Sequence, residues 1–356
     1  MRKRGWIGWL ALAIGLTVLA GPAAAYDELA VEEKALRVVD ALLPPDIETR
    51  KKSMGEAPVE GWVKAVFEAQ SQRGWIPIEL YIREGADYAF MGQMYQLDPS
   101  MDARDKARKA MENRLPPRFD RKLLQSGDTP LEGVKEFLFE VQVPQRGAQP
   151  VAAYVGDGFG VVGQLFGPDN QNLTEVAKQK WAGGQVSWKE LVKGLKPVYG
   201  SEGAPVRFAM FTDPDCPACQ QAKRRIDTLI EKHREDLSGY LLWFPLEMHK
   251  HARPKAEVLA CSTPERQSRM FDALKGSEPG DVEDVYATLQ EEGVEVPERV
   301  RECVSSGKGE EWLKRVREFA NKMQVTSVPS VYYDGRLFKG FPEQEIREAL
   351  RSGSGS

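Results

Sequence analysis

Residues 212–219 read Thr-Asp-Pro-Asp-Cys-Pro-Ala-Cys, between an apolar run at 206–211 and a polar, helix-prone run at 220–232. This order predicts a strand, a tight turn and a helix, with two thiols on the first helical turn. Unpaired N–H groups and the positive end of the helix dipole favour a thiolate at that place. We therefore expect Cys216 to be the nucleophile and Cys219 the resolving thiol of a redox-active disulfide.

The same two cysteines also allow a metal site or a plain structural disulfide. A CxxC pair is often half of a zinc site, but the remaining cysteines, Cys261 and Cys303, are single and 42 positions apart. A haem-attachment motif would carry histidine after the second cysteine, where the chain has Gln220. Redox chemistry is therefore favoured over metal binding, and we expect no metal and no cofactor.

Residues 1–25 have the features of a secretory signal peptide. Basic residues at 2–4 precede an apolar run at 6–20 and then Gly-Pro-Ala-Ala-Ala. This pattern predicts cleavage after Ala25 and export. An uncleaved membrane anchor is the alternative, although the run is short for a span. At the other end, the Ser-Gly residues 352–356 are expected to form a flexible tail.

The charge composition of the chain limits the kinds of molecule that it is expected to bind. The chain carries 49 Lys and Arg against 53 Asp and Glu, a formal net charge of −4, and no basic block stands out. Nucleic acid is therefore not an expected partner. All four cysteines follow the export signal, and an exported chain reaches an oxidising compartment where disulfides persist.

The first half of the chain contains an internal repeat. Its clearest matches, offset by 71 or 72 positions, are Leu-Pro-Pro at 43–45 and 115–117, Phe-Glu-x-Gln at 67–70 and 139–142, and Gly-Gln at 92–93 and 163–164. Such ordered matches indicate a duplicated domain, with copies at 26–100 and 101–170. Neither copy contains a cysteine or a histidine, so we expect a scaffold rather than a catalytic site.

Each copy is expected to begin with a helix, at Glu28–Leu42 and Met101–Leu115, which the following prolines stop. Three or four strands with one covered face should follow it. The strand-like runs are 59–70, 76–82 and 87–91 in the first copy and 131–143, 150–155 and 159–163 in the second. Residues 171–199 are expected to form a helical linker, hinged at Gly183-Gly184, and Gly200–Pro205 to mark the next boundary.

The C-terminal part of the chain comprises residues 200–351. After the CxxC helix, strand-like and helix-like patterns alternate in it. A strand-like run at 240–245 is followed by a helix-rich block at 252–323 and by Val328-Pro329. A strand, an Asp-Gly turn, a return strand and a helix then fill residues 331–350.

This order of elements resembles the thioredoxin fold. Residues 211–219, together with Phe-Pro-Leu-Glu-Met-His at 244–249, are more closely similar to the periplasmic thiol:disulfide interchange proteins of the DsbC and DsbG type. The strand pattern that ends at 92–95 is similar to their N-terminal domain. The resemblance implies that the N-terminal repeats have an α+β, cystatin-like fold and serve for dimerisation. It further implies a helical linker and a catalytic domain with the α/β thioredoxin fold and a helical insertion.

The resemblance also implies roles for particular residues. It implies that Pro329 is cis and packs beside the active-site disulfide, with Val328 directly before it. It further implies a structural disulfide between Cys261 and Cys303. Two buried free thiols are the alternative for this second pair.

The function that the resemblance implies is an exported disulfide isomerase or reductase. Its substrates would be disulfide-containing or unfolded exported proteins, a membrane electron donor of the DsbD type would keep it reduced, and it would form a homodimer through its N-terminal domains. Two copies per chain also allow the copies to pair within one chain. The duplication, the residue Val328 where these proteins have threonine, and the long segment between Cys261 and Cys303 are departures from the pattern.

Two other functions stay open at this point. The last two departures favour a dithiol oxidase or a specialised thiol donor of the DsbA-like kind. The duplicated domains could also act as a chaperone that holds unfolded clients.

Four polar residues near the motif are expected to have no catalytic role. The charges of Asp213 and Asp215 would oppose a thiolate, unless Asp213 caps the turn or the helix. His249 and His251 have no cysteine or acidic cluster beside them in the sequence, so we expect surface or packing histidines.

Overall fold

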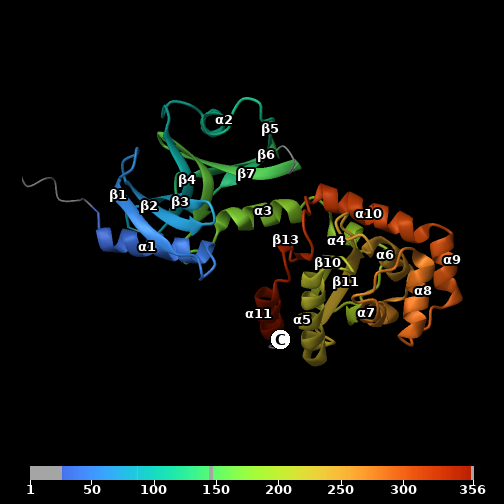
Figure 1. Cartoon of the computed structure of the whole chain (residues 1–356). Coiled ribbons are helices and arrows are strands. Elements are labelled where there is room, and N and C mark those ends of the chain that lie inside the picture. Colours follow the sequence, from blue (N-terminus) through green and yellow to red (C-terminus); the bar gives the residue numbers. More distant parts are fainter. Residues whose placement is uncertain (1–25, 86, 144–146, 354–356) are drawn as a thin grey trace, which may run out of the picture.

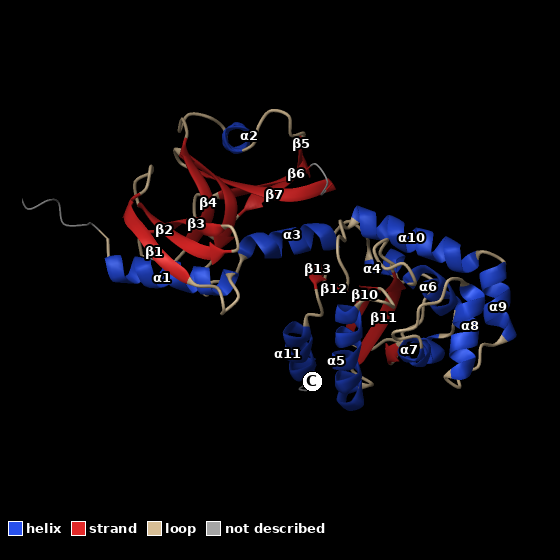
Figure 2. Cartoon of the chain, in the orientation of Figure 1, coloured by secondary structure: helices blue, strands red, loops and turns tan. Residues whose placement is uncertain are grey.

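The structure, a computed structural model, describes residues 26–85, 87–143 and 147–353, so the expected signal peptide lies outside the described residues. An N-terminal curled sheet and a C-terminal α/β domain lie on either side of one connecting helix, α3 (Figure 1). Figure 2 shows that strands dominate the first part and that helices surround the strands of the second. Within the described ranges, no helix is both long and apolar enough to cross a bilayer.

In the described part of the chain, the N-terminal sheet has eight antiparallel strands in the order β1-β2-β3-β4-β8-β7-β6-β5. Each copy of the repeat forms one helix followed by a four-stranded meander. The first copy comprises α1 (Glu28–Leu42), β1 (Thr49–Glu56), β2 (Trp62–Ser71), β3 (Gly74–Arg83) and β4 (Ala89–Gln96). The second comprises α2 (Ala103–Arg114), β5 (Arg121–Asp128), β6 (Lys135–Val143), β7 (Gly147–Gly156) and β8 (Phe159–Phe166).

The two copies pair with each other through β4 and β8, so one continuous sheet runs through both. At the centre of this pairing Gly92 lies opposite Gly163, its equivalent in the repeat. A Cβ at Gly92 would lie 2.3 Å from the Val162 carbonyl oxygen, and one at Gly163 would lie 2.0 Å from that of Met91. Only glycine permits this approach, so the repeated glycine makes the joint between the copies possible.

Helices α1 and α2 cover the same face of the sheet. Phe166 packs in the cluster under α1 and Val162 in the cluster under α2. These residues are four positions apart on β8, and such positions share a face. On the opposite face the sheet curls onto itself, since the ring of Trp62 in the first copy lies 5.8 Å from that of Phe159 in the second.

The sequence pattern does not identify strands β1 and β5, which form the two edges of the sheet. Their sequences, TRKKSMGE and RKLLQSGD, are rich in charged and polar residues. Edge strands often carry such residues because charge discourages pairing with another chain. An analysis based on alternating apolar positions therefore overlooks them.

Among the described residues, the C-terminal part has a five-stranded sheet in the order β13-β12-β10-β11-β9, in which β10 and β11 are parallel. Its strands are β9 (Tyr199–Gly200), β10 (Val206–Thr212), β11 (Leu237–Trp243), β12 (Ser330–Tyr333) and β13 (Arg336–Lys339). Helix α5 (Pro217–His233) connects β10 to β11, and α11 (Glu343–Gly353) ends the domain. Between β11 and β12 the chain inserts α6 (Ala252–Cys261), α7 (Pro264–Ala273), α8 (Val282–Glu291), α9 (Glu298–Ser305) and α10 (Lys308–Lys322).

Helix α3 (Leu173–Gly183) contacts both parts of the molecule. Trp181 packs against the hydrophobic core of each. A Cβ at Gly183 would lie 2.2 Å from a backbone carbonyl oxygen of the β12–β13 turn, so the helix and the turn are in close contact. Nearby, Gln324 Nε2 donates to Glu140 Oε2 of β6 at 2.9 Å.

The C-terminal core begins earlier than the expected boundary at Gly200–Pro205. Ala182, Val186 and Leu191 are all buried in it. Ser187 caps the short helix α4 (Trp188–Leu191) within the same region. Because these apolar side chains pack inward, the second half of the expected linker is part of the C-terminal domain.

Candidate functional site

The thiol site lies at the carboxyl end of β10, where the chain turns into α5 (Figure 1). In a sheet with parallel strands this edge is where ligands and reacting groups are placed. Cys216 is the N-cap residue of α5, and Pro217 occupies the first turn, where its missing N–H costs nothing. As a thiol, the Cys216 side chain makes no N-cap hydrogen bond.

The two thiols differ in their access to solvent. Cys216 is 7% exposed, whereas Cys219, one helical turn further on, is fully buried. Both are free thiols in this structure. A disulfide in another protein can therefore reach Cys216 first, and this order agrees with a nucleophile at Cys216 and a resolving thiol at Cys219.

A second segment meets the thiols from far along the chain. The Val328-Pro329 peptide bond is cis. The Cys216 Sγ–H donates to the Val328 carbonyl oxygen over 3.6 Å. Ser330, directly after the proline, pairs with Phe211 at the end of β10. The pairing of β10 with β12 thus brings the proline loop beside Cys216.

The surroundings make the two thiols unequal acids. The hydrogen bond from the Cys219 side chain, with backbone N–H groups of Cys219 and Ala218, lowers the pKa of Cys216 to about 6. Burial and the Asp213 charge act in the opposite direction on that pKa. The hydrogen bond with Cys216, together with burial, raises the pKa of Cys219 far above its ordinary value. Near neutral pH the site therefore holds one thiolate and one thiol.

Asp213 and His249, which the sequence analysis left without a role, form a pair at the base of this site. The Asp213 carboxylate is fully buried, and its Oδ2 lies 2.8 Å from His249 Nδ1. The same oxygen accepts a hydrogen bond from the Leu246 N–H at 2.7 Å. Oδ1 accepts one from the Asp215 N–H, also at 2.7 Å, so Asp213 caps the turn. The two partners are 36 positions apart, and no local pattern in the sequence could have paired them.

Asp215 has a separate partner that was also missed. The Lys255 side chain is fully buried on α6, and its Nζ lies 2.6 Å from Asp215 Oδ1. Two backbone carbonyl oxygens, of Leu274 and Ser277, complete its hydrogen bonds at 3.1 and 2.5 Å. The charge of Asp215, next to Cys216, is thus balanced by a lysine from the helical insertion.

A shallow, open pocket adjoins the start of α5 and is lined in part by Pro217, Gln220, His249 and His251. The ring of His251 is not held by a carboxylate: its Nδ1 lies 3.1 Å from a backbone oxygen, that of Pro279. Across the residues that the structure describes, no group of three or more His, Cys, Asp or Glu side chains is placed to hold a metal ion.

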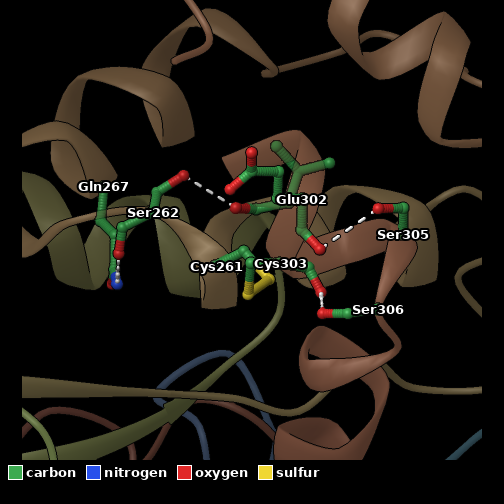
Figure 3. Close-up of a disulfide and its surroundings, with 8 residues drawn as sticks. Cys261, Ser262, Gln267, Glu302, Cys303, Ser305 and Ser306 are labelled. Carbon is green, nitrogen blue, oxygen red and sulfur yellow. Dashed lines mark hydrogen bonds between the residues drawn. A yellow bond between two sulfur atoms is a disulfide. The ribbon is translucent and has the colours of Figure 1, made fainter. Parts of the chain in front are cut away.

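Cys261 and Cys303 form a disulfide with a Cα–Cα separation of 5.7 Å, which links α6 to α9 (Figure 3). Hydrogen bonds surround it: Gln267 Nε2 donates to the Ser262 carbonyl oxygen at 3.1 Å, and Ser306 Oγ donates to that of Cys303 at 3.0 Å. The bond lies within the helical insertion, away from the Cys216 turn, and closes a segment of the chain 42 positions long. In this position the disulfide holds α6 and α9 together.

Comparison with solved structures gives several thiol:disulfide proteins at low identity. Thiol-disulfide exchange protein alpha-DsbA2 from Wolbachia pipientis is 16% identical over 51% of this chain and 98% of its own, with a TM-score of 0.42. A thioredoxin-like oxidoreductase from Silicibacter pomeroyi is 16% identical over 48% of this chain and 99% of its own, with a TM-score of 0.40. DsbA from Chlamydia trachomatis is 18% identical over 46% and 92%, with a TM-score of 0.37.

These TM-scores are below 0.5, so the assignment of the fold does not rest on them. No curated protein matches the chain in sequence. The topology of the C-terminal domain agrees with a match to a family model. The C-terminal domain is thioredoxin-like: residues 193–351 match the family model described as Thioredoxin.

Proposed function

We propose that the protein is an exported thiol:disulfide oxidoreductase that works through Cys216 and Cys219. The observation that carries the proposal is the placement of Cys216. It caps a 17-residue helix, is the more exposed of two adjacent thiols, has a pKa of about 6 and lies beside a cis-proline loop. A thiolate present near neutral pH is the reactive form for attack on a disulfide.

The chemistry balances within the dithiol. The Cys216 thiolate attacks one sulfur of a substrate disulfide, so a Cys216–substrate bond forms and the substrate S–S bond breaks. The leaving substrate thiolate takes a proton from water. Cys219 then loses its proton and attacks the Cys216 sulfur, so the Cys216–Cys219 bond forms and the Cys216–substrate bond breaks. The second substrate sulfur leaves and takes up the proton that Cys219 gave up. Two electrons have moved from the protein to the substrate.

The finer proposal is a disulfide isomerase or reductase of the DsbC and DsbG type, with cystatin-like N-terminal domains and a periplasmic location. In isomerisation a substrate thiolate, rather than Cys219, attacks the mixed disulfide, so no electrons are transferred overall. Cys216 must then be kept reduced, and an electron donor of the DsbD type in the membrane is the partner proposed for this. We further propose a homodimer, and light scattering on the mature protein tests this.

A dithiol oxidase is the second candidate, and Val328 favours it. The Val328 carbonyl oxygen is the group of the proline loop that meets Cys216, and this position carries valine where the DsbC and DsbG type carries threonine. The reduction potential of the Cys216–Cys219 pair separates the two candidates. A strongly oxidising potential without refolding of scrambled substrates would support the oxidase.

The proposal is tested by insulin reduction and by refolding of a scrambled disulfide protein. Cys216→Ser should lower both activities to background, because no other described free thiol is in position to attack. Cys219→Ala should instead accumulate mixed disulfides that are visible on non-reducing gels. Full activity in Cys216→Ser would refute the proposal.

A further inference from the structure

The residue that joins the thiol turn to the segment after β11 is Asp213. Its buried carboxylate accepts hydrogen bonds from the Asp215 and Leu246 N–H groups and holds the His249 ring at 2.8 Å. A buried carboxylate is costly unless charges and donors satisfy it. Asp213 is also close enough to Cys216 for its charge to raise the pKa of that thiol. The turn thus contains a negative charge that opposes the thiolate.

His249 is placed to offset that charge. Its side chain keeps 20% of its surface exposed, so it can exchange a proton with solvent. The backbone fixes its position, because the His249 N–H donates to the Leu246 carbonyl oxygen at 3.0 Å and its own carbonyl oxygen accepts from Ala252 at the start of α6. With Nδ1 against Asp213, the ring orientation is set and Nε2 is the nitrogen that gains or loses the proton.

We infer that His249 is a positioning residue of the thiol site: its imidazolium, held on the Asp213 carboxylate, offsets the buried negative charge and so favours the Cys216 thiolate. This inference rests on the proposed function and adds to it a residue that the thiol motif does not contain. It predicts that the reactivity of Cys216 depends on the charge of a side chain 33 positions away in the sequence.

The electrostatic coupling is mutual. Burial lowers the pKa of His249, but the hydrogen bond and charge of Asp213, with the charges of Cys216 and Asp215, raise it above its ordinary value overall. A thiolate that stabilises the imidazolium is stabilised by it to the same extent, because coupling between two sites is reciprocal. The two groups therefore favour their charged forms together.

Other charges near the pair come from the thiol turn, from α6 and the segment before it, and from the loop between α7 and α8. Asp215 on the same turn is paired with Lys255 of α6. Lys250 precedes α6, and Lys275 and Glu278 belong to the loop between α7 and α8; all three line the pocket with His249. None of these three is hydrogen-bonded to Asp213 in the described residues, so the Asp213–His249 contact is the direct one.

The test is the pH dependence of Cys216 alkylation by iodoacetamide in the reduced, full-length mature protein. His249→Gln keeps an amide that can donate to Asp213 but removes the charge. We expect the midpoint of alkylation to rise by about 0.5–1 pH unit, which lowers the rate at pH 6 by about 2–6-fold. His251→Gln is the matched control, because its ring contacts a backbone oxygen instead of a carboxylate, and its midpoint should match that of the unmodified protein.

A second measurement needs no change at His249. In an NMR titration the His249 midpoint should fall when Cys216→Ser removes the thiolate, by an amount similar to the shift of the Cys216 midpoint in His249→Gln. Unchanged midpoints in both experiments would overturn the inference, as would a loss of thermal stability in His249→Gln without any change in the alkylation profile. An ordinary thiol midpoint and no insulin reduction in the unmodified protein would instead refute the proposed function itself.

Discussion

The N-terminal sheet and the C-terminal domain both bury lysine side chains, but the partners of these lysines differ. In the sheet, Lys34 donates to the Gly167 carbonyl oxygen at 2.5 Å and Lys106 to that of Gly156 at 3.3 Å. Each lies on the first helix of its copy, and each bonds to the backbone. In the C-terminal domain, Lys255 also bonds to backbone oxygens, and in addition it bonds to the Asp215 carboxylate next to Cys216.

The difference between these lysines distinguishes the N-terminal scaffold from the thiol site. A lysine that satisfies backbone oxygens at strand ends stabilises the fold without changing the chemistry of any side chain. A lysine that pairs with a carboxylate one residue from a thiol sets the charge around that thiol. Lys34 and Lys106 of the duplicated half thus bond to backbone oxygens, whereas Lys255 of the thioredoxin-like half pairs with a carboxylate next to Cys216.

Loss of the structural disulfide should have the largest effect on stability and should affect only the C-terminal half. For a closed segment of this length, the chain-entropy account gives about 4 kcal/mol of stabilisation. Cys261→Ala with Cys303→Ala should therefore lower the C-terminal unfolding transition in calorimetry. The transition of the N-terminal sheet should stay in place, and an equal shift of both transitions would contradict the separation.

Gly163→Ala should disrupt the joint between the repeat copies. Its Cβ would meet the Met91 carbonyl oxygen at 2.0 Å, and backbone cannot move away as a side chain can. We expect a loss of about 3 kcal/mol in the N-terminal sheet, measured by urea unfolding. The control is Gly127→Ala on edge strand β5, where a Cβ would meet nothing within 4 Å. Equal effects of the two changes would show that the close approach is unimportant.

Lys255→Met and Lys106→Met compare the two kinds of buried lysine directly. Removal of Lys255 leaves Asp215 unpaired, which should cost about 2 kcal/mol, less than for a fully buried pair because Asp215 is 18% exposed. The midpoint of Cys216 alkylation should also rise. Lys106→Met should cost less than about 1 kcal/mol and leave that midpoint unchanged. A shifted midpoint in Lys106→Met would argue against the division into scaffold and site.

Local patterns were sufficient for much of the fold and for the position of the two thiols. Helix α1 has the bounds that its apolar spacing and the prolines after it indicate, and the TDPDCPAC stretch places both thiols at a helix start. What the sequence could not supply were contacts made by tertiary folding. The pairs Asp213–His249 and Asp215–Lys255 join residues 36 and 40 positions apart, and their members have no special spacing.

The strands that were missed have a different cause. Strands β1 and β5 lie at the edges of the sheet, where charge is retained and alternation is weak. The boundary at Gly200 was placed by its turn-forming residues, whereas the core starts with the apolar side chains of Ala182 and Val186. At the edge strands and at the domain boundary, local composition predicts one structure and the burial of side chains another. The observed structure follows the burial.

The β4–β8 joint has a consequence for how the scaffold assembles. Both partners belong to one chain, so their union is unimolecular and does not weaken on dilution. At low concentration the protein would keep its two half-sheets together without having to find a second copy. Any self-association of the chain must then use surfaces other than the facing edges of β4 and β8, whose backbone groups already satisfy one another.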